Sequence, residues 1–253
     1  MWFDSHCHLH ICEEETPVER LLAEARAEGV DSLVTVGIDV DSSRRSVELA
    51  HIHGVHAAVG IHPGSSEGWT DDALESIEDL ASDDAVVAIG ETGLDFYRDY
   101  SPRPDQARAF RAHIELARRL DKALIIHTRS SLEAALDILE DVGPPDRLVF
   151  HCWSGDKAGL DRVIALGAYV SFAGNVSFKS AEDLRSIVAL VPDDRVVVET
   201  DSPYLSPVPH RGQPNAPARV VHVGAAIATE LGTTAEEVAE QTSGNARRLF
   251  AVA

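Results

Sequence analysis

The stretch between residues 86 and 127 contains VVAIG (86–90), QARAFRAHIELARRL (106–120) and ALIIH (123–127), with a polar connection after the first segment. The two outer segments are short apolar runs that predict buried strands. The middle segment carries Phe110, Ile114 and Ala117 on one face of a helix. A strand, a helix and a strand in this order form a βαβ unit, in which the two strands lie parallel. This stretch therefore predicts a parallel sheet covered by helices.

The same alternation extends in both directions along the chain. The expected strands cover residues 2–5, 32–36, 55–60, 86–90, 123–127, 148–151, 169–172 and 196–199. The expected helices cover residues 17–28, 42–51, 71–80, 106–120, 132–139, 160–167, 181–190 and 218–231, followed by a helix that Thr234 opens and a short turn at 245–250. Eight such units in 253 residues favour an α/β fold, a (β/α)8 TIM barrel with residues 1–253 in a single domain. An open doubly wound sheet is the alternative.

The chain is strongly acidic, with 42 Asp and Glu against 22 Lys and Arg and a formal net charge of −20. Such a surface repels nucleic acid and anionic membranes at ordinary salt. The only lysines are Lys122, Lys157 and Lys179. Acid-rich, lysine-poor composition resembles that of proteins from salt-loving organisms. At ~1 M salt, screening limits the range of a surface charge to ~3 Å. We therefore expect a halophilic source, with an ordinary acidic cytosolic protein as the alternative.

Other features of the composition indicate where the chain works. Hydrophobic residues make up 44% of the chain, enough for a sizeable core, but they form no long uncharged run that could span a membrane. The first ten residues lack the apolar core of a signal peptide. Three cysteines, Cys7, Cys12 and Cys152, cannot form a closed set of disulfides. We expect a cytoplasmic protein with reduced thiols.

Six histidine and carboxylate side chains fall at the carboxyl ends of the expected strands. In a barrel all these ends meet on one face, so residues far apart in the sequence converge there. Without a compensating charge, burying six such groups together would be costly. The set therefore predicts a metal centre. Its members are His6, His8, Glu91, His127, His151 and Asp201.

The number and type of these groups favour two ions. His6 and His8 are two residues apart, so in an extended chain both side chains point the same way. Imidazole and carboxylate together suit zinc, manganese or iron better than calcium. The set exceeds the three protein ligands of one catalytic zinc. We expect two divalent ions per chain (zinc, magnesium or manganese) with a carboxylate between them, and Asp201 is also a candidate base.

Neighbouring histidines and cysteines are expected to play different parts. His62 follows the third strand on the same face and is a candidate for substrate contact. His113 shares a helix face with Phe110, so we expect it to pack in the core. Cys7 and Cys152 adjoin the candidate ligands, and we expect both to be small buried residues rather than nucleophiles.

Together these residues resemble the TatD-type metal-dependent DNases, a family within the wider amidohydrolase-like barrels. The resemblance spans essentially the whole chain, and its blocks occur in the family's order. The blocks are FDSHCHL (3–9), GIHP (60–63), GETGLDFY (90–97), IHTR (126–129), HCWSG (151–155), NVSFK (175–179), ETDSPYL (199–205) and NARRLF (245–250).

The resemblance implies a two-metal phosphodiesterase that degrades DNA, single strands or 3′ ends, by 3′–5′ exonuclease action. It implies that the six residues above hold the metal, with Glu91 as the bridging carboxylate and His62 facing phosphate. We expect a metal-activated water as the nucleophile, Asp201 as the acceptor of its proton, and a monomeric enzyme. The catalytic residues expected are therefore Asp201, Glu91 and His62.

The chain also departs from the family pattern. Gly64 stands where the family often has a second histidine, Trp153 replaces a phenylalanine, and Gln213 replaces a lysine. Arg211 remains in that last stretch, and its planar guanidinium suits bidentate contact with phosphate. The substrate contacts that we expect are His62, Arg129, Lys179, Tyr204 and Arg211.

Two other functions fit the same site. One is hydrolysis of a cyclic amide, lactone or aminoacyl ester, because the barrel fold supports many chemistries. The absence of the lysine that many amidohydrolases carboxylate as a metal bridge, where strand four carries Glu91, counts against it. The other is a metal-dependent binding protein without turnover.

Overall fold

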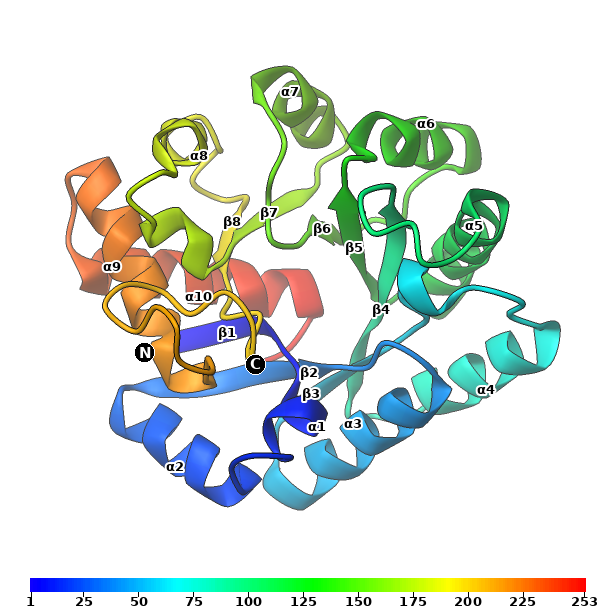
Figure 1. Cartoon of the computed structure of the whole chain (residues 1–253), viewed down its shortest axis with the longest axis horizontal. Helices are drawn as coiled ribbons and strands as arrows, with labels where there is room; N and C mark the ends of the chain where they lie inside the picture. Colours follow the sequence, from blue (N-terminus) through cyan, green and yellow to red (C-terminus); the bar gives the residue numbers. More distant parts are fainter.

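Eight parallel strands follow one another around a barrel in the computed structural model, which describes all 253 residues (Figure 1). The strands are β1 (Trp2–Cys7), β2 (Val30–Val36), β3 (His56–Val59), β4 (Val86–Asp95), β5 (Ala123–Arg129), β6 (Leu148–Phe150), β7 (Tyr169–Phe172) and β8 (Val196–Val198). Each strand pairs with the next one along the chain. A bridge between Cys7 and Ser202 joins the end of β1 to the segment after β8. The (β/α)8 barrel is confirmed, and the open doubly wound sheet is wrong.

The helices surround the barrel on the outside (Figure 1). They are α1 (Leu9–Cys12), α2 (Val18–Ala27), α3 (Val40–His53), α4 (Asp71–Ala81), α5 (Arg103–Leu120), α6 (Leu132–Val142), α7 (Lys157–Ala165), α8 (Glu182–Val188), α9 (Val220–Leu231) and α10 (Ala235–Phe250). Short 3-10 turns lie at Pro63–Ser65, Gly174–Ser177 and Pro217–Arg219. None of the helices combines the length and apolar character needed to cross a bilayer.

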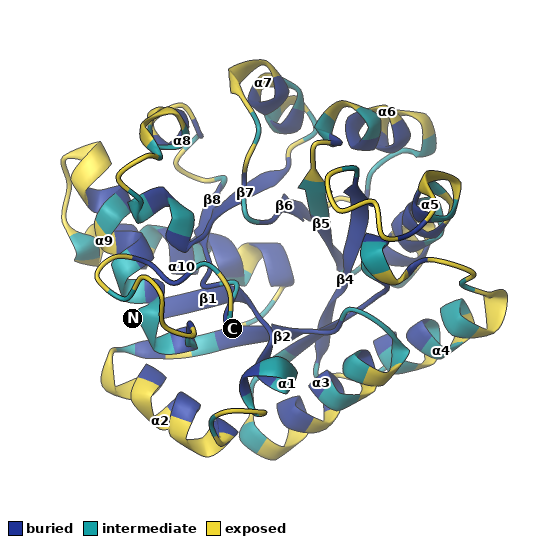
Figure 2. Cartoon of the chain, in the orientation of Figure 1, coloured by how far each residue is buried: buried dark blue, intermediate teal, exposed yellow.

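The strands bury both faces, as a parallel barrel requires. Along β5, Leu124 and Ile126 belong to a large apolar cluster shared with the helices, whereas Ala123 and Ile125 belong to a second cluster. This alternation follows from the two-residue period of a strand. Figure 2 accordingly shows buried strands at the centre and helices whose exposed residues face outward.

β4 is longer than expected from its apolar residues. It continues to Asp95, because after a register shift between Ile89 and Thr92 it pairs again with β5. Glu91 therefore lies inside β4 rather than after it, and His6 likewise lies inside β1. Backbone pairing needs no apolar side chain, so a strand prediction based on hydrophobicity omits the polar residues at these strand ends.

The C-terminal segment also differs from expectation. Thr234 opens a helix with Glu237 in a capping box, as predicted, but that helix runs without a break to Phe250. The predicted separate turn at 245–250 is wrong. Leu249 and Phe250 join the second apolar cluster, and the Phe250 ring lies 5.8 Å from that of Phe3. This burial stabilises the last helical turns despite Gly244 within them.

Candidate metal centre

The six candidate ligands converge at the carboxyl ends of the strands, although they come from five different strands or strand ends. His6 and Glu91 lie in β1 and β4, and His127 lies in β5. His8 and His151 follow β1 and β6 directly, and Asp201 lies three residues after the end of β8. All six are buried or half-buried. Five of them line one cavity of about 670 Å³, namely His8, Glu91, His127, His151 and Asp201.

One group of ligand atoms gathers around one oxygen of Glu91. Oε2 of Glu91 lies 3.4 Å from Nε2 of His6 and 3.8 Å from Nε2 of His8. Oδ1 of Asp201 lies 3.5 Å from Nε2 of His8, and the two Nε2 atoms are 3.3 Å apart. Atoms that share an ion at about 2.0–2.2 Å stand roughly 3–4 Å from one another. This first group, His6, His8 and Asp201 with Glu91, therefore has the spacing of a metal site.

A second group gathers around the other oxygen of Glu91. Oε1 lies 2.7 Å from Nδ1 of His127, 2.8 Å from Nε2 of His151 and 3.7 Å from Nε2 of His62. The His127 and His151 nitrogens are themselves 3.1 Å apart. The two oxygens of one carboxylate thus face two separate sets of imidazoles.

Hydrogen bonds on the far side of two imidazoles orient their lone pairs. Nδ1 of His8 lies 2.9 Å from the carbonyl oxygen of Val36, to which it can only donate. Nε2 of neutral His8 then presents a lone pair to the first group. His151 is held in the same way, because its Nδ1 lies 3.2 Å from Oε1 of Glu199. Lone pairs and carboxylate oxygens that face one another need a cation, so the donor set fits divalent metal.

The electrostatics of the site show the same need for positive charge. Burial favours the neutral form of Glu91, but His151, His62 and His127 outweigh it and hold the pKa of Glu91 well below its usual value. Burial likewise opposes protonation of His151, but Glu91 and Glu199 outweigh it and raise the pKa of His151 well above its usual value. Protons on the histidines therefore balance the carboxylates when no metal does.

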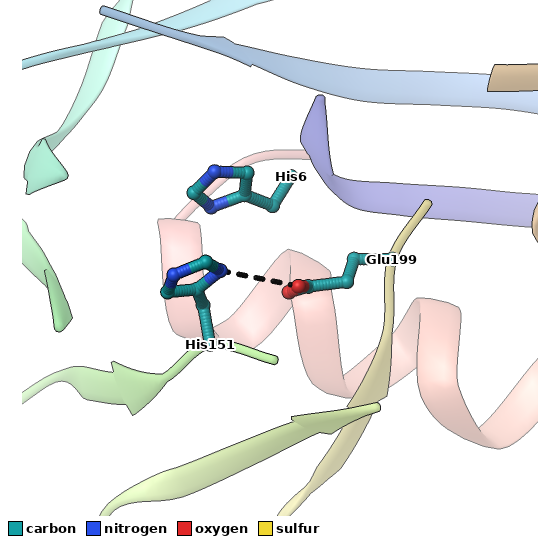
Figure 3. Close-up of side chains that lie close together, drawn as sticks. All are labelled: His6, His151 and Glu199. Atoms are coloured by element: carbon teal, nitrogen blue, oxygen red, sulfur yellow. Dashed lines mark hydrogen bonds and ion pairs between the residues drawn. The ribbon is translucent and has the colours of Figure 1, made fainter. Parts of the chain in front are cut away.

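Glu199 is the important residue that the sequence analysis missed. Its side chain is fully buried at the end of β8, and His6 and His151 lie beside it (Figure 3). One oxygen accepts the bond from His151, whereas Oε2 and the nearby Nδ1 of His6 have no hydrogen-bond partner. The signal was available, since Glu199 stands two residues before Asp201 in a short polar run after apolar β8.

Two aspartates support the site from different positions. Asp95 Oδ2 lies 3.6 Å from Nε2 of His127. Burial works against its charge, but the neighbouring His127 imidazole and hydrogen bonds from the backbone N–H groups of Arg98 and Tyr97 lower the pKa of Asp95 to about 2. Asp4 accepts a hydrogen bond from the backbone N–H of Thr200 at 2.8 Å. Asp95 is thus part of the site, whereas Asp4 joins β1 to the segment after β8.

His62 is placed as a hydrogen-bond donor toward the cavity. Its Nδ1 accepts a bond from the backbone N–H of Gly64 at 2.9 Å, so neutral His62 carries its proton on Nε2. Burial lowers the pKa of His62 to about 4 and keeps it neutral. Gly64 therefore has a local role, because its Cβ would crowd the ring of His62.

The other expected substrate contacts divide into two places. Arg129 and Tyr204 line the cavity. Lys179 and Arg211 are exposed and lie outside it, and the guanidinium carbon of Arg211 sits 3.6 Å from the centre of the Phe178 ring. Two of these four residues are thus brought to the metal centre.

Neighbouring cysteine and histidine side chains largely behave as expected. Cys7 is buried and points away from the ligands, with Sγ 3.4 Å from the carbonyl oxygen of Val34. Cys152 is only half-buried and lines the cavity, which corrects the expectation of full burial, but burial raises the pKa of its thiol well above the usual value. His113 packs in the core, where Nδ1 donates to the carbonyl of Ala109 and Nε2 accepts from the N–H of Ile61.

Comparison with known proteins decides the family. The model of the TatD-related DNases matches residues 3–251. The chain belongs to this family. A Mycobacterium tuberculosis relative named as the uncharacterized metal-dependent hydrolase TatD is 40% identical, over 98% of this chain and 97% of its own length. The crystal structure of YjjV, a TatD homologue from Escherichia coli K12, superposes with a TM-score of 0.93 at 28% identity, covering 100% of this chain and 98% of the other.

One TatD-family relative has a more specific name. The Erwinia tasmaniensis protein called 3′-5′ ssDNA/RNA exonuclease TatD is 32% identical to this chain, over 92% of this chain and 93% of its own length. The family assignment rests on similarity over the full length of the chain, and the exonuclease name describes the Erwinia protein.

Proposed function

We propose that this TatD-family chain is a two-metal-dependent hydrolase that cleaves phosphodiester bonds of DNA from the 3′ end. The observation that carries the proposal is the position of Glu91, whose two oxygens face two separate sets of imidazoles. Such a carboxylate can bridge two ions, and paired ions are suited to clamping the attacking and leaving oxygens of a phosphoryl displacement. The name of the Erwinia relative supports a single-stranded nucleic acid as the substrate.

The residues of the chain would divide the work as follows. His6, His8 and Asp201 would hold one ion, and His127 and His151 the other, with Glu91 between them. The ions would supply positive charge to the phosphate and lower the pKa of water toward ~7.

Asp201 and His62 would handle the protons. Asp201 lines the cavity with Oδ1 3.5 Å from Nε2 of His8, and its carboxylate would accept the proton of the attacking water. Nε2–H of His62 can donate to a phosphate oxygen at the same time. Both roles use atoms that already point into the cavity.

The proposal is tested with metal-stripped protein reloaded with zinc, manganese or magnesium. The substrates are labelled single-stranded and blunt duplex DNA, at salt from 0.1 M to about 2 M because the chain carries a net charge of −20. We expect reloading to restore activity and a 5′-labelled strand to shorten from its 3′ end. Glu91→Gln and Asp201→Asn should lose about 10²–10⁴-fold in kcat. Glu75→Gln, at an exposed position on α4, is the matched control. Full activity in the stripped enzyme or in either site variant would contradict the proposal.

A further inference from the structure

The exposed aromatic side chains of this protein are concentrated at one place. The chain has 7 Phe, 4 Tyr and 3 Trp, and only three of these fourteen rings are exposed. They are Tyr97, Tyr100 and Tyr204, with exposed fractions of 64%, 67% and 52%. Large rings normally contribute to the core, and a group of them left in water marks a binding surface.

The three tyrosines surround the mouth of the metal cavity. Tyr100 and Tyr204 line the cavity, and Tyr97 lies under Arg129, which also lines it. Tyr97 and Tyr100 belong to the loop that follows β4, whereas Tyr204 belongs to the loop that follows β8. In an eight-stranded barrel these two strands stand opposite each other, so aromatic rings face the cavity from both sides.

Two arginines accompany the tyrosines. The guanidinium carbon of Arg129 lies 4.2 Å from the centre of the Tyr97 ring, and that of Arg98 lies 5.8 Å from the centre of the Tyr100 ring. Nη1 of Arg98 also lies 3.3 Å from the Tyr100 hydroxyl. Among the residues that line the cavity they are the only arginines, and no lysine lines it.

Neither arginine has a carboxylate partner. In a chain with 42 acidic residues most arginines form ion pairs, but Arg98 and Arg129 form none. The Arg129 guanidinium lies over the Tyr97 ring and keeps its N–H edge free for phosphate, whereas Arg98 gives one N–H to the Tyr100 hydroxyl and keeps the others. The rim therefore offers flat faces and phosphate donors next to each other.

We propose that these five residues (the aromatic rim: Tyr97, Arg98, Tyr100, Arg129 and Tyr204) form a stacking site for unpaired nucleobases of the strand whose phosphodiester enters the cavity. The proposal rests on the proposed function of the metal centre and names the substrate class more closely. Rings of this kind bind every base through its π-face, whereas a duplex hides those faces within its own stack. The rim would thus select single strands or frayed 3′ ends without selecting sequence.

The test compares two labelled octamers, oligo(dT) and an abasic strand with the same phosphates and no bases. The metal-loaded wild-type protein should have a KM for oligo(dT) about tenfold lower than for the abasic strand. Replacing Tyr97 and Tyr100 together by leucine should abolish this preference by raising KM for oligo(dT). The KM for the abasic strand, which depends on the phosphate contacts of the arginines beside these rings, should rise less. Replacing both by phenylalanine should keep the preference, because the rings remain.

A matched control is Ile52→Ala, on the outward side of α3, where an exposed large side chain lies away from the cavity. Equal KM values for the two strands in the wild type, or an undiminished preference in the leucine variant, would contradict the stacking site while leaving the nuclease proposal intact. Absence of hydrolysis of either strand would contradict the nuclease proposal instead. In that case fluorescence anisotropy with the same uncleaved strands decides the stacking site, and equal Kd values contradict it.

Discussion

Replacing Glu199 by glutamine should weaken metal binding without unfolding the protein. Glu199 contacts the side chain of His151 through Oε1 and lies beside His6, so its carboxylate orients two ligands that belong to different groups around Glu91 (Figure 3). Glutamine keeps the size and an acceptor oxygen but removes the charge. The first consequence should be a looser His151 ring.

The size of the effect follows from the geometry. The Nδ1 to Oε1 distance is 3.2 Å, and the side chains of His151 and Glu199 are 5% and 0% exposed, so water screens the bond little. A hydrogen bond to a charged group contributes about 1.5–3 kcal/mol. Since 1.4 kcal/mol is tenfold, we expect zinc affinity to fall about 10- to 100-fold, the usual cost of losing a carboxylate that orients a metal-binding histidine.

The assay is a competition titration of zinc against a chelating dye, with Glu75→Gln as the matched control. The far-UV circular dichroism of the metal-free variant at the assay temperature should match that of the wild type, which separates loss of orientation from loss of folding. Its thermal unfolding midpoint should fall, because the bond between protonated His151 and the Glu199 carboxylate is lost. A zinc affinity within twofold of the wild type, with the fold intact, would refute the reasoning. It would show that the barrel alone holds His151 in place.

Three further predictions concern stability. Burial lowers the pKa of His113 from 6.5 to about 4. Between these pH values only the unfolded chain takes up this proton, so the free energy of unfolding decreases as the pH falls from 6.5 to 4. Urea unfolding of the metal-free protein should therefore show about 3 kcal/mol less pH dependence over this range in His113→Gln than in the wild type, and identical slopes would contradict this. Gly93 has φ +136°, and a Cβ there would overlap the carbonyl oxygen of His127. Gly93→Ala should therefore lower the free energy of unfolding in denaturant by at least ~2 kcal/mol and also weaken zinc binding. An unfolding midpoint equal to that of the wild type would be inconsistent with the clash. Raising KCl from 0.1 M to about 1 M should raise the melting temperature, because the Debye screening length shortens from ~10 Å to ~3 Å and repulsion among the excess acidic residues weakens. A melting temperature that stays constant or falls with KCl in calorimetry would count against this prediction.

The sequence predicted the barrel because its signals are local. Apolar runs of strand length and helical stripes recur eight times, and neither depends on distant residues. The convergence of the six candidate ligands is predictable by the same means, since parallel strands bring their carboxyl ends to one face. The errors arose where local signals stop. The apolar run of β4 ends at Gly90 and so places Glu91 after the strand, and no local pattern shows that the last helix continues to Phe250, where burial of Leu249 and Phe250 stabilises it.

The sequence by itself therefore determined that the six candidate ligands meet on one face, because strand period and strand order decide which side chains share a face. Only the tertiary structure decided how they meet. It placed one oxygen of Glu91 against each imidazole group, Glu199 behind His151, and the exposed tyrosines around the cavity. These relations join residues up to about two hundred positions apart, and ångström distances between them arise from closure of the barrel and from burial, which no local pattern records.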